Sequence, residues 1–152
     1  MQPLVVRAPV PTEWGPARVH VGEWADATRH HARLLELLGE ALEQPGPEGE
    51  VLAAFEGAAL RGVAIFGFVA GSDRAARLGL LAADAPDVAG HLAQGVARQL
   101  AARGARMVVA EWPDEPPFVA AAARLRELGW SEAGRIADYV APGVDLVILR
   151  QR

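Results

Sequence analysis

The 152-residue sequence is 51% hydrophobic and 22% charged, with a net charge of −4 and no cysteine. A chain of this length buries roughly 68–70% of its unfolded surface when it folds, and we predict a single domain over residues 1–152. The absence of cysteine excludes disulfides and cysteine metal sites. An acidic chain without Lys or Arg runs is not expected to bind nucleic acid. The longest uncharged apolar run, Gly62–Ser72, is too short to cross a bilayer.

The first half of the chain is expected to form one helix and a group of strands. Prolines and glycines predict an irregular segment up to Gly22, and short turns between the later strands are typical of an antiparallel meander. In chain order we predict a strand at Leu4–Val6, a helix from Trp24 to about Leu42 with Asp26 or Thr28 as its N-cap, and strands at Val51–Glu56, Leu60–Ala70 and Ala75–Ala82.

Helices and strands alternate in the second half. Gly104 suits the C-terminal end of a helix, and Pro116 or Pro117 suits the start of the next one. The predicted elements are a helix at Asp87–Arg103, a strand at Arg106–Glu111, a helix ending before Gly129, and strands at Ala133–Val140 and Val144–Leu149. The order β-α-β-β-β-α-β-α-β-β predicts one α+β domain with a mixed, mostly antiparallel sheet of six or seven strands.

Three segments resemble the GNAT superfamily of acyl-CoA N-acyltransferases. They are Arg103-Gly-Ala-Arg-Met-Val-Val-Ala-Glu111, Leu125-Arg-Glu-Leu-Gly-Trp130 and the last hairpin, Gly134–Leu149. Leu60–Ala83 is similar to the central meander of that superfamily more loosely. The resemblance implies a GNAT-like sheet that splays open between the strands ending near Ala83 and Glu111.

The resemblance also implies acetyl-CoA as co-substrate. In GNAT proteins, backbone amides of a loop patterned Arg/Gln-x-x-Gly-x-Gly/Ala hold the pyrophosphate at a helix N-terminus. The matching segment here, Val88-Ala-Gly-His-Leu-Ala93, lacks the basic residue and most of the glycines, and Asp84 and Asp87 stand nearby. We predict that Asp87 caps the helix and that CoA binds weakly. The implied cofactor-binding residues are Leu81, Ala82, Ala83, Val88, Ala89, Gly90, His91 and Leu92.

Two residues are candidates for catalysis. An acceptor amine with a lysine-like pKa of about 10.4 is protonated at neutral pH and needs a general base. Glu111, at a strand end beside the expected splay, is the best carboxylate for this role; the alternative is a solvated glutamate. The family's catalytic tyrosine corresponds to Leu125, and the single tyrosine, Tyr139, is either a catalytic acid or an aromatic that lines the core or the substrate.

The histidines and tryptophans are interpreted structurally. His30 and His31 are adjacent, so only one of them can face inward, and surface or hydrogen-bonded roles are preferred for both and for His91. None of them has metal-ligand spacing with another ligand, and no metal site is predicted. Trp14 and Trp24 flank the irregular segment and line either an apolar binding surface or the underside of a loop.

These observations leave alternative functions. The first is transfer of an acetyl group from acetyl-CoA to a primary amine of a small molecule or a protein. The second is a non-catalytic GNAT-fold binding, regulatory or dimerisation domain, and the third is an unrelated α+β domain, since a fold does not fix a function. A homodimer is compatible with the first two. Met1–Arg7 lacks the apolar stretch of a signal peptide, so the expectation is a cytoplasmic protein without membrane partners.

Overall fold

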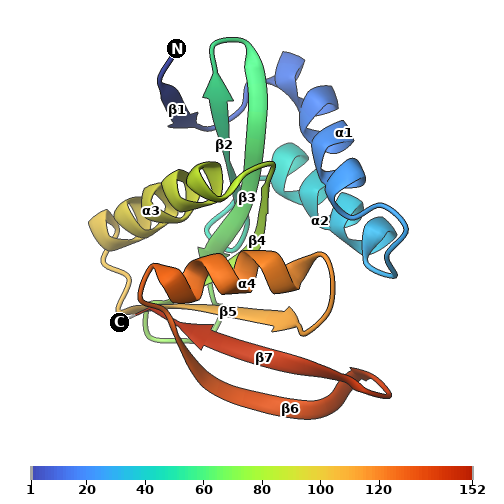
Figure 1. Ribbon diagram of the computed structural model, residues 1–152. Helices are drawn as coiled ribbons and strands as arrows, with labels where there is room; N and C mark the ends of the chain where they lie inside the picture. The colour runs from blue at the N-terminus through green and yellow to red at the C-terminus, as the bar shows by residue number, and fades with distance from the viewer. Residues whose placement is uncertain (1, 152) are drawn as a thin grey trace.

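The computed structural model describes residues 2–151 (Figure 1). These residues form seven strands, four α-helices and one short 3-10 helix, η1. In chain order the elements are β1 (Leu4–Arg7), η1 (Pro11–Glu13), α1 (Trp14–Trp24), α2 (His31–Glu43), β2 (Glu50–Glu56), β3 (Ala59–Phe68), β4 (Ala75–Ala83), α3 (Pro86–Ala102), β5 (Met107–Pro113), α4 (Phe118–Glu127), β6 (Ser131–Ala141) and β7 (Val144–Arg150).

All seven strands belong to one mixed sheet in the order β1-β2-β3-β4-β5-β7-β6. Neighbouring strands pair antiparallel except β4 and β5, which are parallel. A parallel pair cannot be joined by a tight turn, and α3 provides the crossover between them. The predicted α+β class and the predicted mixed sheet of six or seven strands are confirmed.

The N-terminal region differs from the prediction. Residues 14–24 form α1 where an irregular segment was expected, and α2 begins at His31 and not at Trp24. The prolines do not interrupt these helices. Pro11 is the first residue of η1 and Pro16 lies in the first turn of α1, where a missing N–H costs no helical hydrogen bond.

The ends of the helices were only partly predicted. Neither Asp26 nor Thr28 caps α2, whose N-cap residue is His30. The Thr28 hydroxyl donates instead to the carbonyl oxygen of Ala25, at 2.6 Å, inside the turn between α1 and α2. Gly104 follows α3 with a φ of +84°, as its predicted role at the helix end requires.

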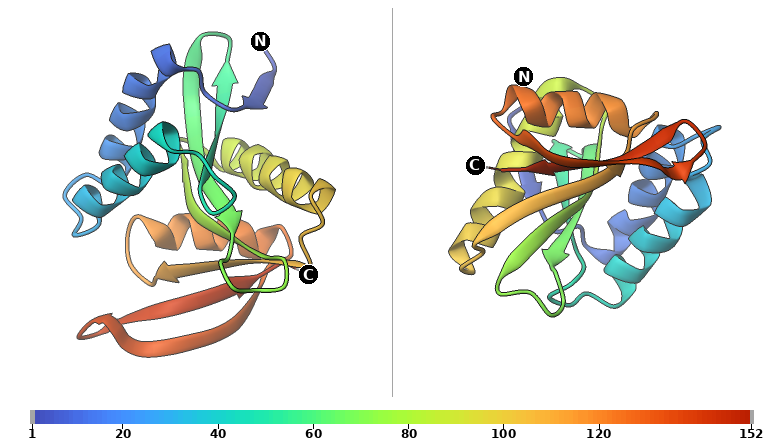
Figure 2. Two further views of the ribbon diagram at one scale, coloured as in Figure 1. Left: turned by 180° about the vertical axis from the view of Figure 1, so that it is seen from behind. Right: turned by 90° about the horizontal axis from the view of Figure 1, so that it is seen from below.

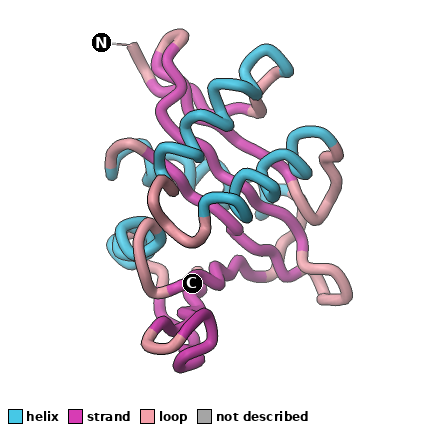
Figure 3. Tube along the Cα trace, turned by 90° about the vertical axis from the view of Figure 1, so that its right-hand side faces the viewer, coloured by secondary structure: helices cyan, strands magenta, loops and turns pink. Residues whose placement is uncertain are grey.

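Helices cover both faces of the sheet, with α1 and α2 on one face and α3 and α4 on the other (Figure 2). In Figure 3, α1 and α2 face the viewer and lie across the strands. Leu38 of α2 and Leu92 of α3 are fully buried against opposite faces of the sheet. Among residues 2–151, no helix has both the length and the apolar character needed to cross a membrane.

Strands β4 and β5 are paired only at their beginnings. The paired residues are Ala75–Arg77 of β4 and Met107–Val109 of β5. Beyond them β4 continues beside β3 to Ala83, whereas β5 continues beside β7, and the two strands leave in different directions (Figure 1). A bulge in β4 at Gly79 accompanies this divergence. We call the region between the diverging strands the split, and the predicted splay is thereby confirmed.

Candidate active site

The indole of Trp112 fills the start of the split. Burial alternates along β5, so Trp112 points to the face covered by α4 while Glu111 points to the opposite face. The indole Nε1 donates to the carbonyl oxygens of Leu78 at 3.1 Å and Gly79 at 3.2 Å, and only 2% of Trp112 is exposed. The Trp112 side chain therefore forms hydrogen bonds to β4 at the point where the backbones of β4 and β5 are no longer paired.

Aromatic rings from both faces of the sheet meet at the split. Trp24 ends α1 and Phe118 begins α4, yet their ring centroids are 5.6 Å apart in an edge-to-face arrangement. Phe118 also contacts the rings of His30 at 5.4 Å and Trp112 at 5.7 Å. Helices on opposite faces can make such a contact because the strands between them have separated. We call these four residues the aromatic cluster.

A half-buried carboxylate holds the aromatic cluster in place. Glu115, in the loop between β5 and α4, lies 2.7 Å from His30 Nε2 and 2.8 Å from Arg29 Nε. The Glu115 side chain is only 17% exposed. The ion pair and the hydrogen bond tie the turn between α1 and α2 to the start of α4.

Replacing Trp112 with phenylalanine is expected to destabilise the fold. The change removes the N–H donor from two carbonyl groups beside a buried ring and leaves a small cavity, and we expect a loss of about 2–3 kcal/mol in the free energy of unfolding. That loss corresponds to a decrease of roughly 4–12 °C in melting temperature, measurable by calorimetry. Trp14→Phe, at a partly exposed position, is the control, and equal effects of the two substitutions would contradict the structural role of the Trp112 indole.

A pocket of about 250 Å³ lies between α3 and α4. It extends from the unpaired edge of β4 to the first turn of α3, and small side chains on both helices keep it open. We call it the α3–α4 pocket. It is lined by Trp24, Leu81, Ala83, Asp84, Ala85, Pro86, Ala89, Ala120, Ala121, Arg124 and Glu127.

The N-terminus of α3 at this pocket has no side-chain cap. The N-cap residue is Ala85 and no side chain bonds to the free amides, so the predicted capping by Asp87 is wrong. Pro86 takes the first helical position, which places Asp87 too far along the helix for its side chain to act as the N-cap. The amides of the first turn therefore remain available to an anion.

Two arginines determine the charge around this helix end. Arg124, from α4, donates through Nε to the carbonyl oxygen of Pro86 at 2.9 Å and pairs with Glu127 at 2.8 Å. Asp84 accepts a hydrogen bond from Arg61 Nε at 2.6 Å, which raises the pKa of Arg61. Asp84 shares Arg61 with Glu56, so its charge is only partly compensated. Arg124, although it also pairs with Glu127, places a guanidinium at the first turn of α3.

A second pocket, of about 280 Å³, opens on the face covered by α2. Glu111 lies at its rim, and Arg77 of β4 pairs with Glu111 at 3.5 Å. Gly79 contributes to its wall, so this pocket and the α3–α4 pocket border neighbouring parts of β4. We call it the α2-face pocket; it is lined by Leu37, Glu48, Ile65, Phe66, Gly67, Phe68, Arg77, Gly79 and Glu111.

The structure brings only some of the predicted cofactor-binding residues to the α3–α4 pocket. Leu81, Ala83 and Ala89 line it. Val88 and Leu92 are fully buried and pack toward β3, next to Gly62.

Three further residues of that set lie outside its lining. Ala82 is buried, and its carbonyl oxygen lies 3.1 Å from His20 Nε2. Gly90 packs under the Arg124 guanidinium. His91 lies on another side of α3, beside β1, and bonds to the carbonyl oxygen of Asp87 at 2.8 Å.

The two predicted catalytic residues lie apart. Glu111 lies at the α2-face pocket, two residues beyond the last β4–β5 pair. Tyr139 is 65% exposed on β6, and its side chain is therefore not part of the core. Leu125, where the resemblance places a tyrosine, is completely buried in α4.

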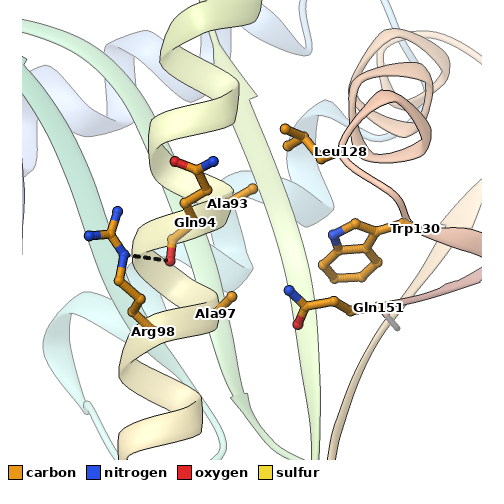
Figure 4. Close-up of a pocket in the computed structure, with 7 residues that line it drawn as sticks. All are labelled: Ala93, Gln94, Ala97, Arg98, Leu128, Trp130 and Gln151. Carbon is orange, nitrogen blue, oxygen red and sulfur yellow. Dashed lines mark hydrogen bonds between the residues drawn. The ribbon is translucent and has the colours of Figure 1, made fainter.

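A larger pocket of about 430 Å³, lined by residues of α3 and by Leu128, Trp130 and Gln151, lies away from the split (Figure 4). Arg98 is the only ionisable side chain in its lining and donates to the backbone carbonyl of Gln94 at 3.4 Å. This pocket has no acid–base pair. Within residues 2–151, no three metal-ligating side chains are grouped closely enough to hold a metal ion.

Solved structures share this arrangement across nearly the whole chain. A protein of Desulfovibrio desulfuricans assigned to the GNAT acetyltransferase family superposes with a TM-score of 0.84, at 20% identity over 99% of both chains. The chain has the GNAT fold. No protein-family model and no curated protein sequence matches it, so the fold is recognised through structure.

Two further N-acetyltransferase structures are similar over comparable lengths. The ribosomal-protein-S18-alanine N-acetyltransferase of Escherichia coli gives a TM-score of 0.70 at 20% identity, covering 98% of this chain and 93% of that one. The aminoglycoside 6'-N-acetyltransferase of Enterococcus faecium gives 0.68 at 12% identity, covering 97% and 96%. These likenesses show that the same architecture extends over nearly the whole chain.

Sequence reasoning missed three residues of the site. Arg124 could not be assigned because its contact depends on how α4 packs against α3. The inward position of Trp112 could have been predicted from the sequence, because strand alternation puts its side chain on the face opposite Glu111. His20 lies on α1, which was not predicted, and a carbonyl acceptor requires that its Nε2 carry the proton in the contact with Ala82.

Proposed function

We propose that the protein is an N-acetyltransferase that transfers the acetyl group of acetyl-CoA to a primary amine. The observation that carries this proposal is the α3–α4 pocket, which joins the unpaired edge of β4 to the uncapped N-terminus of α3 under the Arg124 guanidinium. The pantetheine chain of CoA, which contains amides, can lie along the free edge of β4, and the pyrophosphate that follows it can lie at the N-terminus of α3. The GNAT fold supports the proposal as an analogy.

The residues present fit acetyl-CoA. The free edge of β4 at Leu81 and Ala83 offers backbone groups to a pantetheine chain, which can add to it as another strand would. The amides at the start of α3 and the Arg124 guanidinium face the position of the pyrophosphate. Bound there, acetyl-CoA supplies an activated thioester carbonyl.

Glu111 is proposed as the general base. It lies at the pocket on the opposite face, 38% exposed and bordering the start of the split, where it can accept a proton from an incoming ammonium group. The amine nitrogen then bonds to the acetyl carbonyl carbon, the carbon–sulfur bond breaks, and CoA leaves as the thiol with a proton originating from nitrogen. The sequence has no cysteine to carry the acetyl group, and direct transfer to the amine is part of the proposal.

The position of Trp112 adds a requirement. Its indole lies at the start of the split, on the face covered by α4, and bonds to β4 beside Gly79 of the α2-face pocket. For transfer to occur, the indole must leave the carbonyl oxygens of Leu78 and Gly79 during turnover.

A second candidate function is a non-catalytic domain that binds CoA or a related ligand. The observations that favour it are the filled split and Leu125 at the position of the family's tyrosine. Under this alternative the α3–α4 pocket binds its ligand, and no acetyl group crosses the sheet.

One experiment tests both candidates. Acetyl-CoA at 100 times its dissociation constant stabilises a protein that binds it only when folded by about 2.7 kcal/mol, or roughly 5–11 °C for this size. We expect such a shift, together with release of CoA thiol when a panel of primary amines is added. The protein has no thiol of its own to disturb a thiol assay. A shift without thiol release favours the non-catalytic domain, and the absence of both contradicts the two candidates.

A further inference from the structure

The α2-face pocket combines an apolar floor with a charged rim. Leu37 and Ile65 provide the apolar floor beside the β3 backbone at Phe66–Phe68, and the rim carries one cation, Arg77, and two carboxylates, Glu48 and Glu111. Ile65 is itself buried, so the floor is part of the folded core. A ligand that fits has an apolar body and charged groups at one end.

One wall of this pocket is fixed by the backbone. The loop before β2 packs directly on β3, where the amide of Phe68 donates to the carbonyl oxygen of Pro47 at 2.6 Å. A Cβ atom on Gly67 would lie 2.3 Å from the backbone of Glu48. Since loop and strand touch, the pocket is closed on this side and suits a compact ligand better than a chain that passes through.

The ion pair at the rim is loosely made. Arg77 and Glu111 approach through one nitrogen and one oxygen at 3.5 Å, and their side chains are 46% and 38% exposed. An exposed pair of this kind contributes little to stability and can be opened at low cost. Opened, it presents a guanidinium fork beside a carboxylate.

A zwitterion satisfies both members of this pair. Its carboxylate can accept two hydrogen bonds from the planar guanidinium of Arg77, while its ammonium group faces Glu111 and Glu48. A simple monoamine leaves Arg77 without a new partner and adds a cation beside it. The charges of the rim therefore favour an amine that carries an anionic group next to its nitrogen.

We propose that the α2-face pocket binds a free amino acid with an apolar side chain, and that this amino acid is the acceptor of the acetyl group. The assignment of the amino acid as acceptor rests on the proposed function. Its ammonium group lies at Glu111, the proposed base, and its side chain lies on the floor made by Leu37 and Ile65.

Three amines of similar shape distinguish the contribution of the ligand's carboxylate from that of its ammonium group. L-leucine carries both groups, leucinamide replaces the carboxylate with a neutral amide, and isopentylamine lacks it. We expect kcat/KM for leucine to exceed that for isopentylamine by about ten- to a hundredfold, as for one hydrogen bond to a charged group. In Arg77→Gln this preference should disappear, and Arg77→Lys should retain part of it. Arg98→Gln, on the opposite face of the sheet, is the matched control and should keep the preference.

Direct binding separates this inference from the proposed function. Titration of the protein with leucine, followed by NMR without CoA, should show saturable binding that Arg77→Gln weakens and Arg98→Gln does not. Such binding with no acetylation of any amine would reject the transferase but keep the amino-acid site. Acetylation of isopentylamine as fast as leucine, or a preference for leucine that survives Arg77→Gln, would overturn the inference, as would the absence of leucine binding at millimolar concentration.

Discussion

Glu111→Gln is expected to lower the rate of acetyl transfer at pH 7 by about 100- to 10,000-fold, the usual contribution of a positioned general base. The wild-type protein can take the proton from an ammonium group at Glu111. The glutamine variant cannot accept this proton, so its rate is limited by the small fraction of amine that is already neutral in solution. That fraction rises tenfold for each pH unit below the pKa of the amine, so the loss should shrink as the pH rises toward about 10.

The measurement is therefore a pair of pH–rate profiles between pH 6.5 and 10 with the best amine of the panel. The profile of Glu111→Gln should be steeper than that of the wild type, and Glu111→Asp should recover part of the rate. Glu36→Gln is the control, because Glu36 is an exposed residue of α2 that pairs with Arg33. Parallel profiles for the wild type and Glu111→Gln would show that Glu111 positions the substrate electrostatically and is not the base.

Most of the fold could be predicted from local patterns. The turns between the central strands, Gly104 after α3 and the apolar spacing of the helices each depend on neighbouring residues, and each was found in the structure. The first helix was missed because prolines were interpreted as breakers without considering their position. Pro16 falls in the first turn of α1, where proline is tolerated.

The site could be predicted less well than the fold because its decisive contacts join distant residues. Arg124 reaches Pro86 across 38 positions of sequence, and His30 reaches Glu115 across 85. The charges of Asp84 and Asp87 suggested repulsion of an anion. That interpretation considered the loop alone. In the structure Asp84 shares Arg61 with Glu56, and Arg124, which also pairs with Glu127, lies at the helix end, so the strength of CoA binding stays a prediction.

Replacing Arg124 with glutamine is expected to raise the dissociation constant for acetyl-CoA by about ten- to a hundredfold. The change removes a guanidinium that contacts the first turn of α3 and leaves Asp87 there, so a pyrophosphate loses a charge-assisted hydrogen bond. Arg124→Glu should weaken binding further. Arg126→Gln is the matched control, since Arg126 is on the same helix but pairs with Glu132 of β6.

Calorimetric titration at two salt concentrations would show whether the Arg124 effect is electrostatic. Salt should weaken the binding of acetyl-CoA to the wild type more than to Arg124→Gln, because screening acts on the charge that the variant lacks. Acetyl-pantetheine, which has no pyrophosphate, should bind the wild type and Arg124→Gln alike. An equal loss for both ligands would mean that the substitution distorts the α3–α4 pocket. Unchanged affinity for acetyl-CoA would show that Arg124 does not contact the pyrophosphate, which would then be bound mainly by the backbone amides of α3.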